Sequence, residues 1–318
     1  MTIFDFEKPI TELENAIEEL RRLAVEKGID RSREIAELES QREQLLRQIF
    51  AHLKPWDKVL LARHPKRPYA MDYIRMMCEQ FLELHGDRLG FDDPAIVAGL
   101  AKLGSYRLVV VGQQKGRDLR ERQKRNFGMA KPEGYRKAMR MFQLAEKFRL
   151  PVLTLVDTPA ADPGVEAEAR GISEAIARSM LTLFDLTVPT ISVILGEGGS
   201  GGAIALAATN RVLMLEHAIY SVIPPEGCAA ILWRDPNRAP QAAEALRLTA
   251  EDALQMGLID LIIPEPLGAA HRDPQATALS VRTAVLQQLD ELRQLEPDAL
   301  REQRYQRFRQ IGVYQIAR

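Results

Sequence analysis

The sequence predicts an α/β fold, in which helices alternate with mostly parallel strands. From residue 95 onward, short apolar runs alternate with stretches of helical periodicity. The run Pro189–Leu195 is followed by five glycines within residues 196–202 and then by a small-residue helix from Ala203. Since strands separated by helices are joined by right-handed crossovers, these observations favour an α/β core with tight turns at the strand ends.

Composition excludes several classes of protein. The 318 residues are 46% apolar and 27% charged, with a formal net charge of −1, so no global field favours nucleic acid or a membrane surface. Cys78 and Cys228 are far apart and lack a CxxC partner, which argues against a disulfide framework and a cysteine-based zinc site. No run approaches the ~20 apolar residues of a membrane span. We expect a soluble intracellular protein.

Two helical stripes open the chain and predict a helical hairpin. Leu13, Ile17, Leu20 and Ala24 share one face, and a second stripe follows after Gly28. We interpret residues 1–60 as a packing or assembly arm and residues 61–318 as the main domain. Residues 63–68 are expected to form a basic loop, and residues 73–84 a helix.

The β-rich part is expected to begin with a hairpin at residues 95–101 and 108–112. The basic stretch that follows could hold the phosphates of a nucleotide-like ligand, or it could be a charged helix surface diluted by Asp118 and Glu121. Its cations are Lys115, Arg117, Arg120, Arg122, Lys124 and Arg125.

The remaining elements alternate regularly. The pattern predicts helices over 132–148, 165–184, 241–257 and 279–295, strands over 151–157, 189–195, 211–215, 218–223 and 259–263, and a peripheral basic tail over 301–318. The turns 158–164 and 196–202 end two successive strands. We therefore expect these turns to face one another across a pocket.

The glycine-rich segment fits three motifs. Gly196-x-Gly198-x-x-Gly201 matches a dinucleotide fingerprint, but the crossover that follows is too short for that fold. Gly198-x-Ser200-x-Gly202 matches a nucleophile elbow, with His217 and His271 as the histidines that follow it. The third interpretation uses only the backbone, whose N–H groups at the helix start would stabilise an oxyanion.

Four strings closely resemble the carboxyltransferase α-subunit family of bacterial-type acetyl-CoA carboxylases. The segment 263–268 before His271 also matches that family, except that Ala269 stands where a glycine is usual. The strings are Arg125–Met129, Pro132–Ala138, Gly196–Ala203 and Pro225–Trp233.

The resemblance implies a crotonase-type (ClpP/crotonase-like) spiral of ββα units. It also implies transfer of a carboxyl group from carboxybiotin to acetyl-CoA, which gives malonyl-CoA for fatty acid biosynthesis. The implied partners are a zinc-containing β subunit in an α2β2 assembly, the biotin carboxyl carrier protein and biotin carboxylase. No metal is expected in this chain, and the implied location is the cytoplasm or a plastid stroma.

The resemblance also assigns roles to residues. Gly201, Gly202 and Ala203 would face the biotin oxygen, and the turn at Ala160 and Ala161 would form the second wall. Cofactor contacts would come from Gly198, Gly199, Lys115, Arg117 and Arg125.

One departure affects the first turn. The family usually has Asp-Thr-Pro-Gly-Ala-Tyr-Pro-Gly where this chain has Asp157-Thr158-Pro159-Ala160-Ala161-Asp162-Pro163-Gly164. A positive φ at Ala160 would strain the turn, and Asp162 adds an anion near a site for anions. We therefore expect reduced or altered activity. The alternatives are a stand-alone crotonase-type acyl-CoA hydrolase or isomerase, and a non-catalytic scaffold for the β subunit.

Overall fold

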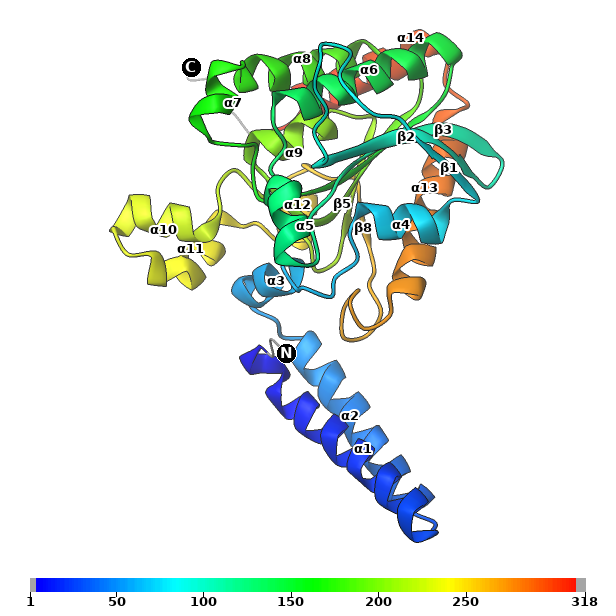
Figure 1. Ribbon diagram of the computed structural model, residues 1–318, viewed down its shortest axis with the longest axis vertical. Helices are drawn as coiled ribbons and strands as arrows, with labels where there is room; N and C mark the ends of the chain where they lie inside the picture. Colours follow the sequence, from blue (N-terminus) through cyan, green and yellow to red (C-terminus); the bar gives the residue numbers. More distant parts are fainter. Residues whose placement is uncertain (1–3, 313–318) are drawn as a thin grey trace, which may run out of the picture.

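The computed structural model describes residues 4–312, and it has a helical hairpin projecting from an α/β body (Figure 1). The short 3-10 helix η1 (Asp5–Glu7) leads into α1 (Lys8–Lys27), and α2 (Ser32–Phe50) runs back beside it. Gly28 ends α1 with a φ of 62°. The predicted hairpin is confirmed. A domain boundary at residue 60 stays a prediction; that position lies inside α3 (Pro55–Ala62), which packs on the body.

One mixed sheet forms the centre of the body, in the order β1-β2-β3-β4-β5-β6-β8, with β7 added to the end of β5. The first three strands are antiparallel neighbours and all later pairs are parallel. The predicted hairpin at its start is therefore confirmed. The strands are β1 (Gln80–Glu83), β2 (Ile96–Leu103), β3 (Tyr106–Gln113), β4 (Val152–Thr158), β5 (Thr190–Gly199), β6 (Arg211–Leu215), β7 (Ile219–Ser221) and β8 (Leu261–Ile263).

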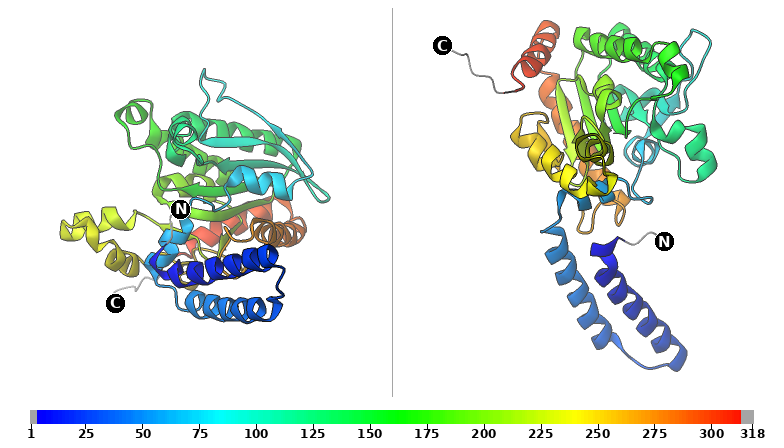
Figure 2. Two further views of the ribbon diagram at one scale, coloured as in Figure 1. Left: turned by 60° about the horizontal axis from the view of Figure 1, so that its bottom comes forward. Right: turned by 90° about the vertical axis from the view of Figure 1, so that its left-hand side faces the viewer.

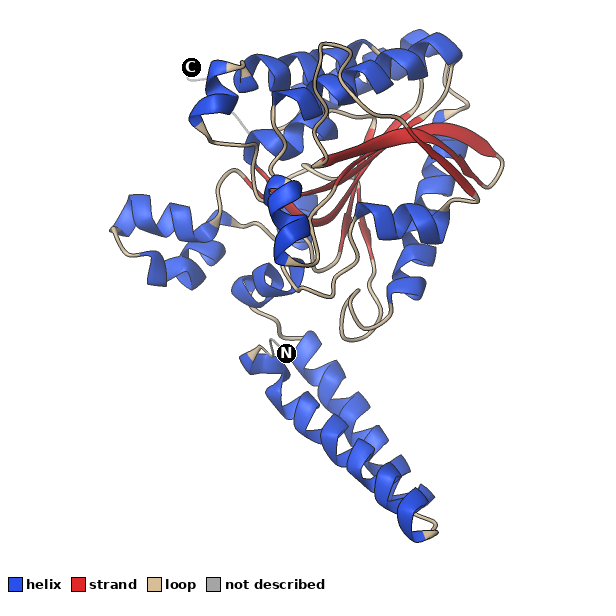
Figure 3. Cartoon of the chain, viewed as in Figure 1, coloured by secondary structure: helices blue, strands red, loops and turns tan. Residues whose placement is uncertain are grey.

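Helices cover both faces of this sheet (Figures 2 and 3). On one face α6 (Pro132–Phe148) and α9 (Ser200–Ala207) pack directly on the strands, and α8 (Ile172–Asp185) packs outside them. On the other face lie α4 (Ala70–Met77) and α13 (Pro274–Leu292). The other helices are α5 (Leu119–Lys124), η2 (Asn126–Gly128), α7 (Val165–Ala169), α10 (Pro225–Trp233), η3 (Pro236–Arg238), α11 (Ala239–Leu246), α12 (Ala250–Gln255) and α14 (Pro297–Arg309).

Three predicted elements were wrong in part. The segment 73–84 ends its helix at Met77 and continues as edge strand β1, because Phe81 and Leu82 pair with β2. The predicted helices 165–184 and 241–257 are each two helices, separated where Gly171 adopts a φ of 81° and where Arg247 adopts a φ of 49°. Within residues 4–312, no helix combines the length and apolar character needed to cross a membrane.

The predicted peripheral tail is also wrong over its described part; residues 313–318 lie outside the described range. The side chain of Arg304 in α14 is fully buried. Its guanidinium donates to the carbonyl oxygens of Phe184 and Leu186 at 3.0 and 2.8 Å and to Asn210 Oδ1 at 2.6 Å. Helix α14 is thus held by an arginine that bonds carbonyl groups at the C-terminal end of α8.

Candidate functional site

The glycine-rich segment is not the loop that the sequence predicted. Strand β5 runs through Gly199, and α9 begins at Ser200 without an intervening loop. Ser200 has a φ of 49°, whereas none of the glycines at 196–202 has a positive φ. All of them except Gly201 are therefore needed for space rather than for a left-handed backbone. A Cβ on Gly199, for example, would lie 1.9 Å from the carbonyl oxygen of Pro159.

The same space requirement brings the two turns together. A Cβ on Gly202 would lie 2.7 Å from the backbone of Ala160 and Ala161. The turns are therefore adjacent, as predicted, but they are in direct contact rather than separated by a pocket. Ala160 does not have a positive φ, so the backbone strain expected at this position is not present.

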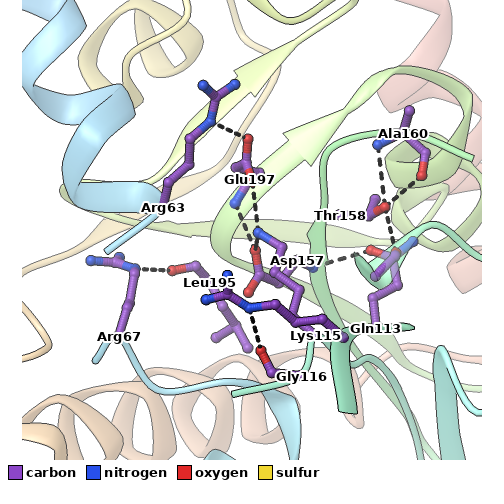
Figure 4. Close-up of polar contacts among 12 residues, drawn as sticks. Arg63, Arg67, Gln113, Lys115, Gly116, Asp157, Thr158, Ala160, Leu195 and Glu197 are labelled. Atoms are coloured by element: carbon purple, nitrogen blue, oxygen red, sulfur yellow. Dashed lines mark hydrogen bonds and ion pairs between the residues drawn. The ribbon is translucent and has the colours of Figure 1, made fainter. Parts of the chain in front are cut away.

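A β-bulge explains how the end of β5 reaches the turn. The register of β4 and β5 runs from Val156 opposite Ile194 to Thr158 opposite Gly198, so β5 has extra residues between these pairs. Side chains bond the backbone groups that the bulge frees. Arg67 donates to the carbonyl oxygen of Leu195 at 2.8 Å, and Glu197 N–H donates to Asp157 Oδ1 at 2.9 Å (Figure 4).

A buried ionic network lies beside the bulge (Figure 4). Lys115 Nζ is 2.7 Å from Asp157 Oδ1 and 2.7 Å from Glu197 Oε2, and Arg63 Nε is 2.7 Å from Glu197 Oε1. Burial alone would lower the pKa of Lys115, but the two carboxylates outweigh it and raise the pKa. Burial raises the pKa of Asp157, whereas Lys115 and Arg63 overcome burial and lower that of Glu197. The ammonium group is therefore a fixed structural charge.

The cations predicted to bind a cofactor already have partners within the chain. Arg117 pairs with Asp72 and donates to the carbonyl oxygen of Pro65 at 3.1 Å. Arg125 pairs with Glu121 at 3.0 Å and donates to the carbonyl oxygen of Pro94 at 2.7 Å. Their role toward a cofactor, like that of Lys115, stays a prediction.

Two main hollows, a polar cavity and an apolar groove, open near the glycine-rich segment. A cavity of about 170 Å³ contains Lys115 and is lined also by Arg63, Tyr69, Arg122, Phe127 and Glu197. Arg122 has no carboxylate partner within residues 4–312, because its guanidinium is bonded only to the carbonyl oxygen of Gly116, at 3.1 Å. The cavity therefore contains a cation that no carboxylate of the described residues neutralises. Gly198 and Gly199 line a small hollow next to it, which shares Arg63, Pro159 and Glu197.

The second hollow is an apolar groove of about 340 Å³ at the start of α9. Ser200, Gly201 and Ile204 form one side, and Tyr220, Val222 and Phe308 lie among the residues of the other. The first N–H groups of a helix lack intrahelical partners. Within residues 4–312, the N–H groups of Gly201 and Gly202 make no hydrogen bond outside α9. The groove therefore combines apolar walls with the positive end of a helix dipole.

The predicted catalytic residues differ in whether they line the groove. Gly201 lines the groove, whereas Gly202 and Ala203 are buried behind it. Ala160 and Ala161 are half-buried and lie against Gly202. Their catalytic roles stay predictions. No histidine is among the groove residues, so Ser200 has no base beside it there.

One group of side chains has the composition of a metal site. Ligand atoms of Glu7, His64 and His271 lie within 4.8 Å of one another, where η1 meets two loops of the body. However, Arg272 lies 3.9 Å from Glu7, and His64 Nδ1 accepts the N–H of Lys66 at 3.2 Å. A nearby guanidinium and an occupied ring nitrogen disfavour a cation, so this group is a polar junction between arm and body.

Sequence reasoning missed several residues of the ionic network. Asp157 and Glu197 come near the carboxyl ends of neighbouring parallel strands, and Lys115 follows the end of a third. Ligand sites of α/β sheets lie at such ends, so polar residues at three successive strand ends were a usable signal. Arg63 and Arg67 come from the loop after α3, and nothing in their local pattern placed them here.

Comparisons with known proteins agree on one family. Residues 3–312 match the family model described as acetyl co-enzyme A carboxylase carboxyltransferase-like. The chain is 54% identical over 312 residues to the acetyl-coenzyme A carboxylase carboxyl transferase subunit alpha of Zymomonas mobilis, covering 98% of this chain and 99% of that one. It is 50% identical over 314 residues to the protein of the same name from Acaryochloris marina, covering 99% and 97%.

Solved structures with the same fold are more distant in sequence. A Pseudomonas malonate decarboxylase hetero-tetramer in complex with coenzyme A contains a chain with a TM-score of 0.60 and 18% identity, covering 74% of this chain and 91% of that one. Transcarboxylase 12S gives a TM-score of 0.59 at 20% identity, covering 72% of this chain but 42% of that chain. The expected crotonase-type fold is confirmed.

Proposed function

The chain belongs to the carboxyltransferase α-subunit family of acetyl-CoA carboxylase, and from this premise we propose that the first turn of α9 receives the biotin oxygen during carboxyl transfer. Its function is that of the α subunit of a biotin-dependent carboxyltransferase, in the first step of fatty acid biosynthesis. The substrates are carboxybiotin and acetyl-CoA. The C–N bond of carboxybiotin breaks, a C–C bond forms at the acetyl methyl group, and the methyl proton passes to the biotin nitrogen.

The groove at the start of α9 carries this proposal. As the carboxyl group leaves, negative charge develops on the biotin oxygen, which preorganised N–H donors stabilise best in a site with little water. Gly201 lines the groove, and Gly202 follows it in the same turn. The apolar side chains of Ile204, Val222 and Phe308 suit the hydrocarbon part of biotin.

The active site is completed by a β subunit. Ile204 and Val222, which line the groove, are exposed by 40% and 73%, a large apolar exposure for two neighbouring side chains. We propose that a zinc-containing β subunit covers this side and holds the acyl-CoA thioester in an α2β2 assembly. The biotin carboxyl carrier protein then delivers its biotin between the subunits, after biotin carboxylase has loaded it.

Arg122 is the favoured contact for a phosphate of CoA. It lines the 170 Å³ cavity, and no carboxylate of the described part of the chain pairs with it. Guanidinium groups bind phosphate through paired N–H donors. Lys115, Arg117 and Arg125 would act mainly by holding the cavity in shape.

Carboxylation of free biotin by malonyl-CoA tests the proposed function. The chain is co-expressed with the carboxyltransferase β subunit, and malonyl-CoA-dependent biotin carboxylation is measured with the complex and with each subunit alone. We expect activity only in the complex. An intact complex without activity would leave the scaffold interpretation.

A stand-alone hydrolase remains the alternative because Ser200 has the positive φ expected of a nucleophile at a strand-to-helix turn. The isolated chain would then hydrolyse acyl-CoA thioesters, and Ser200→Ala would abolish that hydrolysis. In the carboxyltransferase, Ser200→Ala keeps the backbone N–H groups and retains most of the transfer activity.

A further inference from the structure

We propose that Gln113 is a positioning residue for carboxyl transfer, because its side-chain amide ties the first turn of α9 to the end of β4. Gln113 is the last residue of β3 and is fully buried. Its Nε2 donates to the carbonyl oxygen of Gly202 at 2.7 Å. Its Oε1 accepts the N–H of Asp157 at 3.1 Å (Figure 4). The inference rests on the proposed function, in which α9 receives the biotin oxygen.

The bond to Asp157 continues the sheet where its backbone ladder stops. The paired register of β3 and β4 ends at Gly112 opposite Leu155. Beyond it, the side chain of Gln113 accepts the Asp157 N–H in place of a backbone carbonyl. Asp157 also holds Lys115 and the bulge of β5 through Glu197 N–H. Gln113 thereby fixes the position of the strand end that supports the ionic network.

The bond to Gly202 orients the helix start. The Gly202 carbonyl and the Ala203 N–H belong to one planar peptide unit, so fixing the oxygen fixes the plane. The backbone of Ala160 and Ala161 closes the other side, because a Cβ on Gly202 would lie 2.7 Å from it. The first turn of α9 is therefore held by a hydrogen bond on one side and by a steric contact on the other.

The two bonds require an amide. One atom must accept from an N–H and another must donate to a carbonyl oxygen, and a primary amide supplies both. Methionine has similar length and supplies neither. An ionised glutamate can accept but cannot donate, whereas a protonated glutamic acid can do both. Burial favours the neutral acid, so Gln113→Glu is a pH-dependent replacement.

The neighbouring residue offers a matched control. Gln114 is also buried, accepts the N–H of Met71 at 2.9 Å and donates to the carbonyl oxygen of Lys115 at 3.0 Å. It therefore makes the same two kinds of hydrogen bond, but neither of them reaches α9 or Asp157. Gln114→Met also removes two hydrogen bonds, but it leaves both bonds of Gln113 to α9 and to Asp157 in place.

The test compares Gln113→Met, Gln113→Glu and Gln114→Met in the complex with the β subunit. We expect Gln113→Met to lower kcat for biotin carboxylation about ten- to a hundredfold, the usual effect of a small displacement of catalytic groups, with KM for malonyl-CoA within about twofold. Gln114→Met should keep kcat within about threefold of wild type. Gln113→Glu should regain activity as the pH falls. Equal kcat values for the two methionine variants, or no pH-dependent recovery, would overturn the inference.

Hydrogen exchange provides a readout that does not depend on activity. In Gln113→Met the amide of Asp157, which loses its acceptor, and the hydrogen-bonded amides of α9 at residues 204–207 should exchange at least about fivefold faster than in Gln114→Met. Unchanged exchange there would overturn the positioning role even if activity fell. If the wild-type complex lacks transferase activity, the proposed function fails, and the exchange comparison still decides whether Gln113 holds the turn. If Gln113→Met does not fold, the hydrogen exchange of Gln113→Glu is compared with that of wild type instead.

Discussion

Gly199 lies directly against the carbonyl oxygen of Pro159, so that a Cβ at position 199 would stand 1.9 Å from that oxygen. The oxygen belongs to the backbone and the position of a Cβ is fixed by the backbone, so neither atom can rotate away as the end of a side chain would. The carbonyl carbon of Pro159 and the carbonyl oxygen of Thr158 would also lie within 2.3 and 2.8 Å of the added atom. The contact therefore fixes how closely the turn after β4 approaches the start of α9.

Gly199→Ala should separate these two turns. We expect a loss of about 3 kcal/mol of unfolding free energy, as for a severe overpacking substitution, measured by denaturant titration. Gly201→Ala is the matched comparison, because its Cβ would lie 3.4 Å from the side chain of Ile176 and should be tolerated. Equal stability of the two variants would contradict the close contact.

The sequence predicted the α/β class, the hairpin arm and most strands because apolar periodicity is a local signal. It predicted the nearness of the turns at 158–164 and 196–202 because both follow successive parallel strands. It could not predict that β5 continues through Gly199, since glycines are weak strand formers. The strand extends there because β7 pairs with Glu197, Gly198 and Gly199, which is a tertiary effect.

Lys115 is expected to be essential for stability, because it compensates two buried carboxylates. Lys115→Met would leave Asp157 and Glu197 without their shared cation, at a cost of about 3–5 kcal/mol. Lys124→Met is the control: Lys124 is exposed and has no carboxylate partner within the described residues. The free energy of unfolding of both variants is compared at neutral pH. A loss below about 1 kcal/mol in Lys115→Met would contradict the structural role.

The two departures from the family pattern at the first turn, Ala160 and Asp162, should affect turnover differently. Ala160 has no positive φ, so Ala160→Gly relieves no strain and should leave turnover within about twofold of wild type.

Asp162, the second departure in this turn, accepts the N–H of Gly164 at 2.9 Å. Asp162→Asn keeps an acceptor and removes the charge. We expect turnover to rise about two- to fivefold, because the anion opposes the negative charge that develops during transfer. Turnover is measured in the complex with the β subunit, and an unchanged rate in Asp162→Asn would exclude the electrostatic effect.

The other departure, at position 269, is a different case. Ala269 has a φ of 75° and is fully buried, so the position where the family usually has glycine does require a left-handed backbone. The sequence identified both departures equally well. It could not rank them, because the sign of φ is set by the surrounding fold and not by the residue itself.

The junction between arm and body should make stability depend on pH. Burial, together with the neighbouring His271, lowers the pKa of His64 from 6.5 to about 4. Between these values the unfolded chain binds a proton that the folded chain does not, so stability is lost as the pH falls from 6.5 toward 4. His271 also lowers the pKa of Glu7 against the opposing effect of burial, and this adds a further loss at still lower pH.

His64→Gln removes the first of these effects. We expect the wild-type unfolding free energy to fall by up to about 3 kcal/mol between pH 6.5 and 4, since one pKa unit corresponds to about 1.4 kcal/mol, and the variant to show a much flatter dependence. His52→Gln is the control, because His52 is exposed in the loop after α2 and should keep the wild-type slope. The melting temperature of the three proteins is followed across this range. Identical slopes for wild type and His64→Gln would show that the histidine is not buried at the junction as the structure places it.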